Sequence, residues 1–200
     1  QDPQFSMFQH NRLFPNPGVA GSNDMICGTA ILREQWNGFE GNPRTFMLSG
    51  HMPITIPYIG ESGVGLAIAQ DQLGQETSTL LKGIYAWRKQ LGDGKLGVGL
   101  GLGMLGKSVG ADWVATDDYL LDEAINNAAA SDFNFDLDFG LYYKKEGEYY
   151  VGLSATHLLA NEINVNAPGA AGVGAFVYKI ARHYYLQAGY TYEMTSDLDL

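Results

Sequence analysis

The stretch K-L-G-V-G-L-G-L-G-M-L-G, from Lys95 to Gly106, decides the fold of this 200-residue chain. Apolar side chains alternate with glycines throughout it, and a period of two is that of a β-strand. In a helix the same glycines would be spread over all sides, at a cost of about 1 kcal/mol each relative to alanine. The stretch therefore predicts a strand with one apolar face and one bare face.

The bare face points to a curved wall. Glycine in a strand is entropically costly, and it usually marks the close approach of other groups or a tight bend in a barrel. A strand of about ten residues, tilted by roughly 45°, spans close to the 25 Å apolar band of an outer-membrane protein. We therefore expect an all-β fold, an antiparallel transmembrane β-barrel of the outer membrane. In it Leu96, Val98, Leu100 and Leu102 face lipid.

Other stretches alternate in the same way, and roughly nine strands are predicted. They span about 25–35, 43–52, 62–70, 77–89, 95–106, 134–144, 148–159, 172–180 and 184–194. Single-chain bacterial barrels close with an even number of strands and leave no free edge. We therefore expect residues 25–200 to form an incomplete barrel, with further strands beyond residue 200.

The predicted strand at 134–144 has an apolar and an acidic face. Phe135, Leu137, Phe139 and Leu141 lie on the first, which we expect to face lipid, and Asp136 and Asp138 lie on the second. Carboxylates on an inner face are what a water-filled or plugged lumen requires. A polar change at Asp136 should then be tolerated.

Residues 1–24 form a separate N-terminal arm. It contains three prolines and no sustained period, so extended or turn structure is expected. Burial of Phe5, Phe8 and Phe14 would contribute roughly 1.5–3 kcal/mol each. We therefore expect the arm to pack on the barrel or inside it.

The connection at about 107–132 lacks alternation and is the longest in the chain. Thr116, followed by two aspartates, resembles a helix N-cap, so the segment to Ala130 is expected to include a short helix. Long loops of bacterial barrels lie on the outer surface and are often functional. The loop either binds a partner or covers the barrel mouth. Its candidate partner-binding residues are Trp113, Asp117, Asp118, Tyr119, Asp122 and Glu123.

Composition excludes several classes of protein. A formal net charge of -10 argues against a nucleic-acid partner. The apolar runs are shorter than the 18–20 residues of a membrane helix, so any membrane role must use strands. The chain opens on Gln1, as expected for a mature form after signal-peptide removal. Cys27 is the single cysteine, which leaves no disulfide framework.

No motif supports catalysis. The four histidines (His10, His51, His157 and His183) are dispersed along the chain, and the acidic cluster at 112–123 lacks the spacing of an EF-hand. No serine, histidine and aspartate can be assigned to a triad, and no G-x-G pair precedes a helix. We expect no enzymatic activity, no cofactor and no metal site.

Four short strings are not explained by packing. They are Q-D-P-Q-F-S (1–6), N-P-G-V-A-G-S (16–22), R-E-Q-W-N-G-F-E-G-N-P-R-T (33–45) and G-V-G-L-A-I-A-Q-D-Q-L-G (63–74). In this order and spacing they closely resemble the PorP/SprF family of the type IX secretion and gliding machinery of Bacteroidota. The motif residues, with a structural or partner-binding role, are Asp2, Pro3, Phe5, Asn16, Pro17, Gly21, Ser22, Arg33, Gln35, Trp36, Gly38, Pro43 and Thr45.

The resemblance implies a non-enzymatic outer-membrane component that anchors or helps export secreted, adhesin-like surface proteins through their C-terminal domains. It also implies contacts with periplasmic or outer-membrane components of the secretion system. Members of the family are usually longer than this chain. Two alternatives stay open: a porin or small-molecule transporter, whose channel Asp136 and Asp138 would line, and a soluble lipocalin-like binding barrel.

Overall fold

The computed structural model describes residues 8–110, 129–165, 176–195 and 198–199. Apart from two short 3₁₀ helices, η1 (Phe8–His10) and η2 (Pro17–Val19), the regular structure of this part is all strand. The strands are β1 (Cys27–Glu34), β2 (Arg44–Ile56), β3 (Gly60–Leu73), β4 (Glu76–Leu91), β5 (Gly94–Val109), β6 (Ala130–Lys145), β7 (Tyr149–Thr156), β8 (Glu162–Val165), β9 (Phe176–Lys179), β10 (His183–Tyr190), β11 (Glu193–Thr195) and β12 (Leu198–Asp199).

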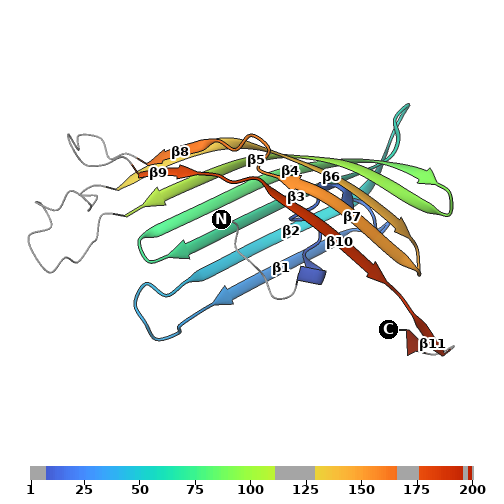
Figure 1. Cartoon of the computed structure of the whole chain (residues 1–200), viewed down its shortest axis with the longest axis horizontal. Helices are drawn as coiled ribbons and strands as arrows, with labels where there is room; N and C mark the ends of the chain where they lie inside the picture. The colour runs from blue at the N-terminus through green and yellow to red at the C-terminus, as the bar shows by residue number, and fades with distance from the viewer. Residues whose placement is uncertain (1–7, 111–128, 166–175, 196–197, 200) are drawn as a thin grey trace, which may run out of the picture.

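Eight of these strands form one antiparallel sheet, in the order β1-β2-β3-β4-β5-β6-β7-β10. The sheet curls into a half-barrel, with β1 and β10 at its two edges (Figure 1). The prediction of an all-β, antiparallel and incomplete barrel is confirmed. Among the described residues, no helix is long and apolar enough to cross a membrane.

The two faces of the sheet alternate as the sequence predicts. On β5, Leu100 and Leu102 are 50% and 70% exposed on the convex face, and the neighbouring Gly99, Gly101 and Gly103 are buried on the concave face. On β6, Phe135 and Phe139 are exposed, whereas Asp136 and Asp138 are buried. The assignment of these side chains to opposite faces is therefore confirmed.

The strands of the wall are longer than predicted at the long connection. β5 continues to Val109 and β6 begins at Ala130, and these two residues pair with each other. The strands on both sides of the connection predicted at about 107–132 are therefore longer than expected, because the backbone ladder continues after the side-chain alternation has become irregular. Residues 111–128, with the predicted helix, lie outside the described part.

The sequence also misplaced the segment after β7. β7 ends at Thr156 instead of continuing to residue 159, because His157 and Ala160 have φ of 57° and 48°, which no strand allows. The chain then forms β8, which was not predicted, and β8 pairs with β9 in a separate two-stranded sheet. The predicted strand at 172–180 is thus not part of the wall.

Residues 11–22 of the arm lie against the concave face. Leu13, Phe14, Val19 and Ala20 are buried in one cluster with side chains of β2, β3, β4 and β6. The expectation for Phe8 was wrong, since this ring is 70% exposed, and Phe5 lies outside the described residues. The division of the chain into arm and barrel stays a prediction.

The two ends of the wall differ in their connections. At one end, which we call the short-turn end, the connections are residues 57–59, 92–93 and 146–148, and the arm enters β1 there. At the other, the long-loop end, they are residues 35–43, 74–75, 110–129 and 157–182. The β8–β9 hairpin lies at the long-loop end (Figure 1).

Candidate functional site: the concave face

Backbone of the arm lies directly on glycines of the wall. A Cβ added to Gly99 would be 2.2 Å from the carbonyl carbon of Pro17, and one added to Gly63 would be 2.1 Å from the carbonyl oxygen of Ala20. Real Cβ atoms essentially never make such contacts. Gly97 and Gly99 thus leave the space that η2 fills, whereas Gly101 and Gly103 face the side chains of Asp138 and Asp136.

Asn16 fixes this contact. The side chain is fully buried, its Oδ1 accepts a hydrogen bond from the Gly18 N–H at 2.9 Å, and its Nδ2 donates to the carbonyl of Leu141 at 3.1 Å. The first bond caps η2, which begins with Pro17, a residue suited to that position. The second joins the helix to β6.

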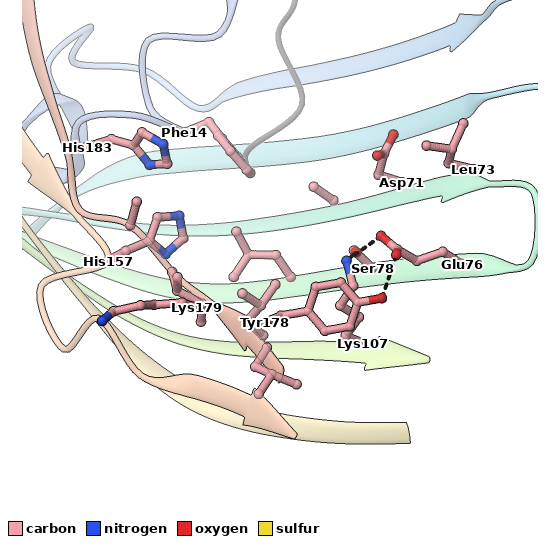
Figure 2. Close-up of a pocket in the computed structure, with 16 residues that line it drawn as sticks. Phe14, Asp71, Leu73, Glu76, Ser78, Lys107, His157, Tyr178, Lys179 and His183 are labelled. Atoms are coloured by element: carbon pink, nitrogen blue, oxygen red, sulfur yellow. Dashed lines mark hydrogen bonds and ion pairs between the residues drawn. The ribbon is translucent and has the colours of Figure 1, made fainter. Parts of the chain in front are cut away.

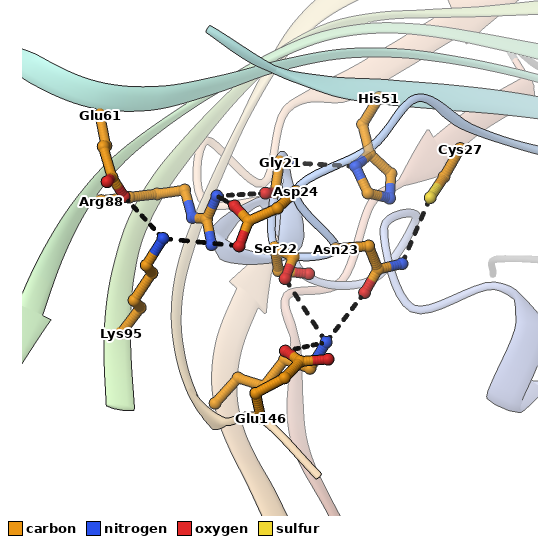
Figure 3. A network of polar contacts seen from close by, with 11 residues as sticks. Gly21, Ser22, Asn23, Asp24, Cys27, His51, Glu61, Arg88, Lys95 and Glu146 are labelled. Carbon is orange, nitrogen blue, oxygen red and sulfur yellow. Dashed lines mark hydrogen bonds and ion pairs between the residues drawn. The ribbon is translucent and has the colours of Figure 1, made fainter. Parts of the chain in front are cut away.

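A network of ion pairs holds the arm at the short-turn end (Figure 3). Arg88 of β4 donates to the carbonyl of Gly21 and pairs with Asp24 at 2.7 Å, and Lys95 of β5 joins Asp24 at 3.4 Å and Glu61 at 2.9 Å. Burial tends to raise the pKa of Asp24, but the hydrogen bond and charge of Arg88, aided by Lys95, hold that pKa below its ordinary value. Asp24 is therefore ionised at neutral pH and links two strands to the arm.

Two further wall residues hold the same segment. His51 of β2 accepts a hydrogen bond from the Gly21 N–H through Nδ1 at 3.0 Å. Lys144 of β6 donates to the carbonyl of Ser22 and to Oδ1 of Asn23, at 3.5 and 3.2 Å. Contacts from β2, β4, β5 and β6 thus converge on residues 21–24.

A buried charge cluster lies between β4 and β6 in the middle of the concave face. Lys82 is 1% exposed; its ammonium lies 2.5 Å from Oδ2 of Asp138 and donates to the carbonyl of Phe14 at 3.3 Å. Oδ1 of Asp138 accepts from the backbone N–H of His157, and Asp136 pairs with the imidazole of His157. Asp136 and Asp138 are 4% and 2% exposed, so they do not line an open channel. Asp136 is a buried partner of His157, which argues against the expected tolerance of this position to a polar change; that tolerance stays a prediction.

The same cluster has the donor set of a metal site. One ligand atom each from Asp136, Asp138 and His157 lies within 4.8 Å of the others, and the ring of His183 is 5.5 Å from that of His157. Carboxylate and imidazole are ligands of zinc and related ions. In this protein the ammonium of Lys82 supplies a positive charge at Asp138. Spacing in the sequence gave no sign of this cluster, because the turn after β7 brings His157 beneath β6.

A cavity of about 310 Å³ opens towards the long-loop end (Figure 2). Apolar residues of its wall include Phe14, Leu80, Leu105 and Ile163, and its polar residues include Asp71, Glu76, Lys107, Tyr178, His157 and His183. Figure 2 shows Phe14 and the two histidines at one end and Glu76, Lys107 and Tyr178 at the other. Phe14 of the arm thus forms one end of the cavity.

A model of one protein family, described as type IX secretion system membrane protein PorP/SprF, matches residues 1–200. The chain belongs to the PorP/SprF family. No curated protein and no solved structure matches it. As a PorP/SprF protein it is a membrane component of the type IX secretion system, as its motifs predicted.

In this PorP/SprF chain the motif residues fall into two groups. Asn16, Pro17, Gly21 and Ser22 are buried in the arm. The second group lies on β1, on β2 and in the connection between them: Arg33, Gln35, Trp36, Gly38, Pro43 and Thr45. The structure does not bring the groups into one site, and Asp2, Pro3 and Phe5 lie outside the described residues. Their role stays a prediction.

Residues of the second group form a turn, and one of them donates a hydrogen bond to the carboxylate of Asp71. Trp36 and Gly38 have positive φ, and the Gln35 N–H donates to the carbonyl of Pro43 at 3.0 Å, which closes the loop. Trp36 is 69% exposed at its tip. The hydroxyl of Thr45 donates to Oδ1 of Asp71 at 2.6 Å, and Asp71 faces the cavity. All six candidate residues of the partner loop lie in 111–128, outside the described residues.

Proposed function

We propose that this PorP/SprF chain is a non-enzymatic outer-membrane component of the type IX secretion and gliding machinery. It anchors or helps export secreted, adhesin-like surface proteins by binding their C-terminal domains. Family membership over residues 1–200 carries this proposal. Periplasmic or outer-membrane components of the same system are further partners, and the convex face contacts the lipid bilayer.

Features of the half-barrel support a receptor more than a pore. The arm fills the short-turn half of the concave face and is held there by buried hydrogen bonds and ion pairs. In outer-membrane barrels the short turns are periplasmic and the longer loops extracellular. The cavity and the loop at 110–129 would then face the cell exterior, where a secreted protein is met.

Copurification tests the proposed function. The tagged protein, extracted from its own cells in mild detergent, should retain secreted surface proteins through their C-terminal domains. Replacement of Thr116 to Ala129 by a short Gly-Ser turn should abolish this capture, because the partner loop is then lost, and a heat-modifiable barrel should remain. As a matched control, substitution of Tyr58, an exposed residue of the opposite end, should leave capture intact.

Full capture after loop replacement would exclude the loop as the binding surface and leave the function in place. Steady conductance in planar bilayers, without any copurifying surface protein, would favour the porin or transporter alternative.

A further inference from the structure

The cavity at the long-loop end is enclosed by parts of the chain that are far apart in sequence. Its wall consists of the ends of β3, β4 and β5, the hairpin of β8 and β9 covers it, and Phe14 of the arm closes its inner end (Figure 2). About 310 Å³ lies at the lower limit of ligand pockets, which measure about 300–1,000 Å³. The space therefore suits one long side chain rather than a domain.

The acidic residues that line the cavity are Asp71 and Glu76, and the basic ones are Lys107 and Lys179. Glu76 pairs with Lys107 and accepts a hydrogen bond from the hydroxyl of Tyr178 at 2.9 Å. The Lys107 ammonium also lies over the Tyr178 ring, 4.0 Å from its centroid. Burial, followed by the hydrogen bond and the charge of Glu76, raises the pKa of Tyr178 to about 12. The phenol therefore stays protonated and can donate its hydrogen bond. This group fastens β9 to the wall.

Asp71 differs from these groups. It lines the cavity from β3, and the hydroxyl of Thr45 holds its Oδ1 at 2.6 Å. Within the described residues no ion pair forms on this carboxylate, and Oδ2 has no hydrogen-bond donor. Asp71 is only partly buried, so water can solvate Oδ2 in the cavity, but an apolar occupant would displace that water and leave the carboxylate desolvated. The cavity thus has a fixed anionic acceptor beside an apolar surface.

We propose that this cavity binds a lysine or arginine side chain of a partner polypeptide. The aliphatic stem lies against Phe14, Leu80 and Leu105, and the cationic head pairs with Asp71. Long basic side chains bury their stems and keep their heads at polar groups, and a net charge of -10 attracts a basic partner. An acidic side chain would meet Asp71 as a like charge, and an aromatic one would leave it unpaired.

This assignment deepens the function proposed above and rests on it for the source of the side chain. Its chemistry can be tested with small probes on the full chain in lipid nanodiscs. N-acetyl-lysine amide, N-acetyl-norleucine amide and N-acetyl-glutamate amide present the same backbone with a cationic, a neutral and an anionic side chain. Saturation-transfer NMR detects their weak binding.

The lysine probe should bind at least roughly tenfold more tightly than the norleucine probe, because only it forms the charge-assisted pair, and the glutamate probe should not bind. Asp71→Asn keeps the bond from Thr45 and should remove the preference for lysine. Asp93→Asn, an acid of the opposite end that is 84% exposed at its side chain, should leave it unchanged. Equal binding of lysine and norleucine, or unchanged lysine binding to Asp71→Asn, would overturn the assignment. Heat-modifiable migration of each variant verifies folding.

The probes and the copurification assay can fail separately. If the surface protein is captured and the lysine probe does not bind, the cavity assignment is wrong and the proposed function stands. If the probe binds through Asp71 and no secreted protein is ever captured, the cavity binds a basic side chain from another source, and the proposed function is wrong.

Discussion

The two halves of the concave face are built from the same strands but carry different side chains. In the half covered by the arm, the inner face of β5 presents Gly97, Gly99, Gly101 and Gly103. In the cavity half the same face presents Leu105, Lys107 and Val109. The inner face of β5 thus has no side chains where other parts of the protein fill the interior. It has large side chains where the cavity lies.

The halves also differ in how their charges are solvated. Side chains of the Lys82–Asp138 pair in the covered half are 1% and 3% exposed, whereas those of the Lys107–Glu76 pair in the cavity half are 14% and 34% exposed. A buried charge without its partner costs several kcal/mol, while a solvated pair contributes little. The covered half is therefore the fixed part of the interior.

The largest expected effect comes from one substitution made in each half. Lys82→Met should lower the free energy of unfolding by about 3–5 kcal/mol, because Asp138 stays buried without its cation. Lys107→Met should cost about 1–2 kcal/mol, from a partly exposed pair and the contact with Tyr178. Urea unfolding in detergent, followed by tryptophan fluorescence, measures both. Equal losses would erase the distinction between the halves.

Arginine substitutions on the convex face test whether that face contacts lipid along its whole length. Leu100→Arg, on the convex face of β5, should destabilise the membrane-embedded protein by about 2–4 kcal/mol, because the charge lies near the bilayer centre. Leu91→Arg, at the end of β4, should cost about 0–1 kcal/mol at the interface. Refolding into lipid vesicles provides the measurement. Similar values at both positions would show that this face does not meet lipid.

A methyl group on a covered glycine should displace the arm. Gly99→Ala is expected to cost about 1–3 kcal/mol, since the added Cβ meets the backbone of Pro17. Gly83→Ala is the matched control, because an added Cβ there meets nothing within 4 Å. Limited proteolysis should cleave the arm faster in the first variant only. Equal protection in both would separate the glycine pattern from the arm.

The smallest expected effect is the loss of the stabilising contribution of Asp24 at low pH. The folded-state pKa of Asp24 is below its ordinary value of about 3.9, so its stabilising contribution is complete above that value and is lost as the pH falls through the folded pKa. The side chain is 56% exposed, which keeps the effect below about 1 kcal/mol. Asp24→Asn should therefore be less stable than the parent at pH 7, and the difference should be smaller at a pH well below about 3.9. A constant difference at both pH values would show that Arg88 and Lys95 do not hold the arm through this charge.

The sequence predicts the wall well because alternation is a local property. The period of two at Leu96 to Met104 and at Phe135 to Tyr143 fixes both the strands and their faces. The prediction fails where the side-chain pattern suggests a strand but the backbone does not adopt a strand conformation. At His157 and Ala160 a left-handed backbone ends β7 within an otherwise apolar, strand-like stretch. β8 has four residues, too few for its alternation to be recognised.

The interior could be predicted only in part. Glycines at 97 and 99 indicate close approach, but nothing in their spacing says that Pro17 and Gly18 approach them. Likewise Lys82, Asp138 and His157 meet across strands that are paired through β5, so their distances depend on the curl of the sheet. Asp71 and Thr45 lie in two motif strings that the sequence does identify, but their hydrogen bond follows from the register of β2 with β3.

The contact between Asn16 and Leu141 has a consequence for the order of folding. These residues are 125 positions apart, and the glycine surface under η2 is completed only when β5 and β6 have paired. Closing so long a loop has an entropic cost, and contacts of high sequence separation form slowly. The arm, although it precedes every strand of the wall in the chain, therefore docks late. Until it does, Leu13 and Phe14 lack the side chains of β2, β3, β4 and β6 that bury them in the folded protein.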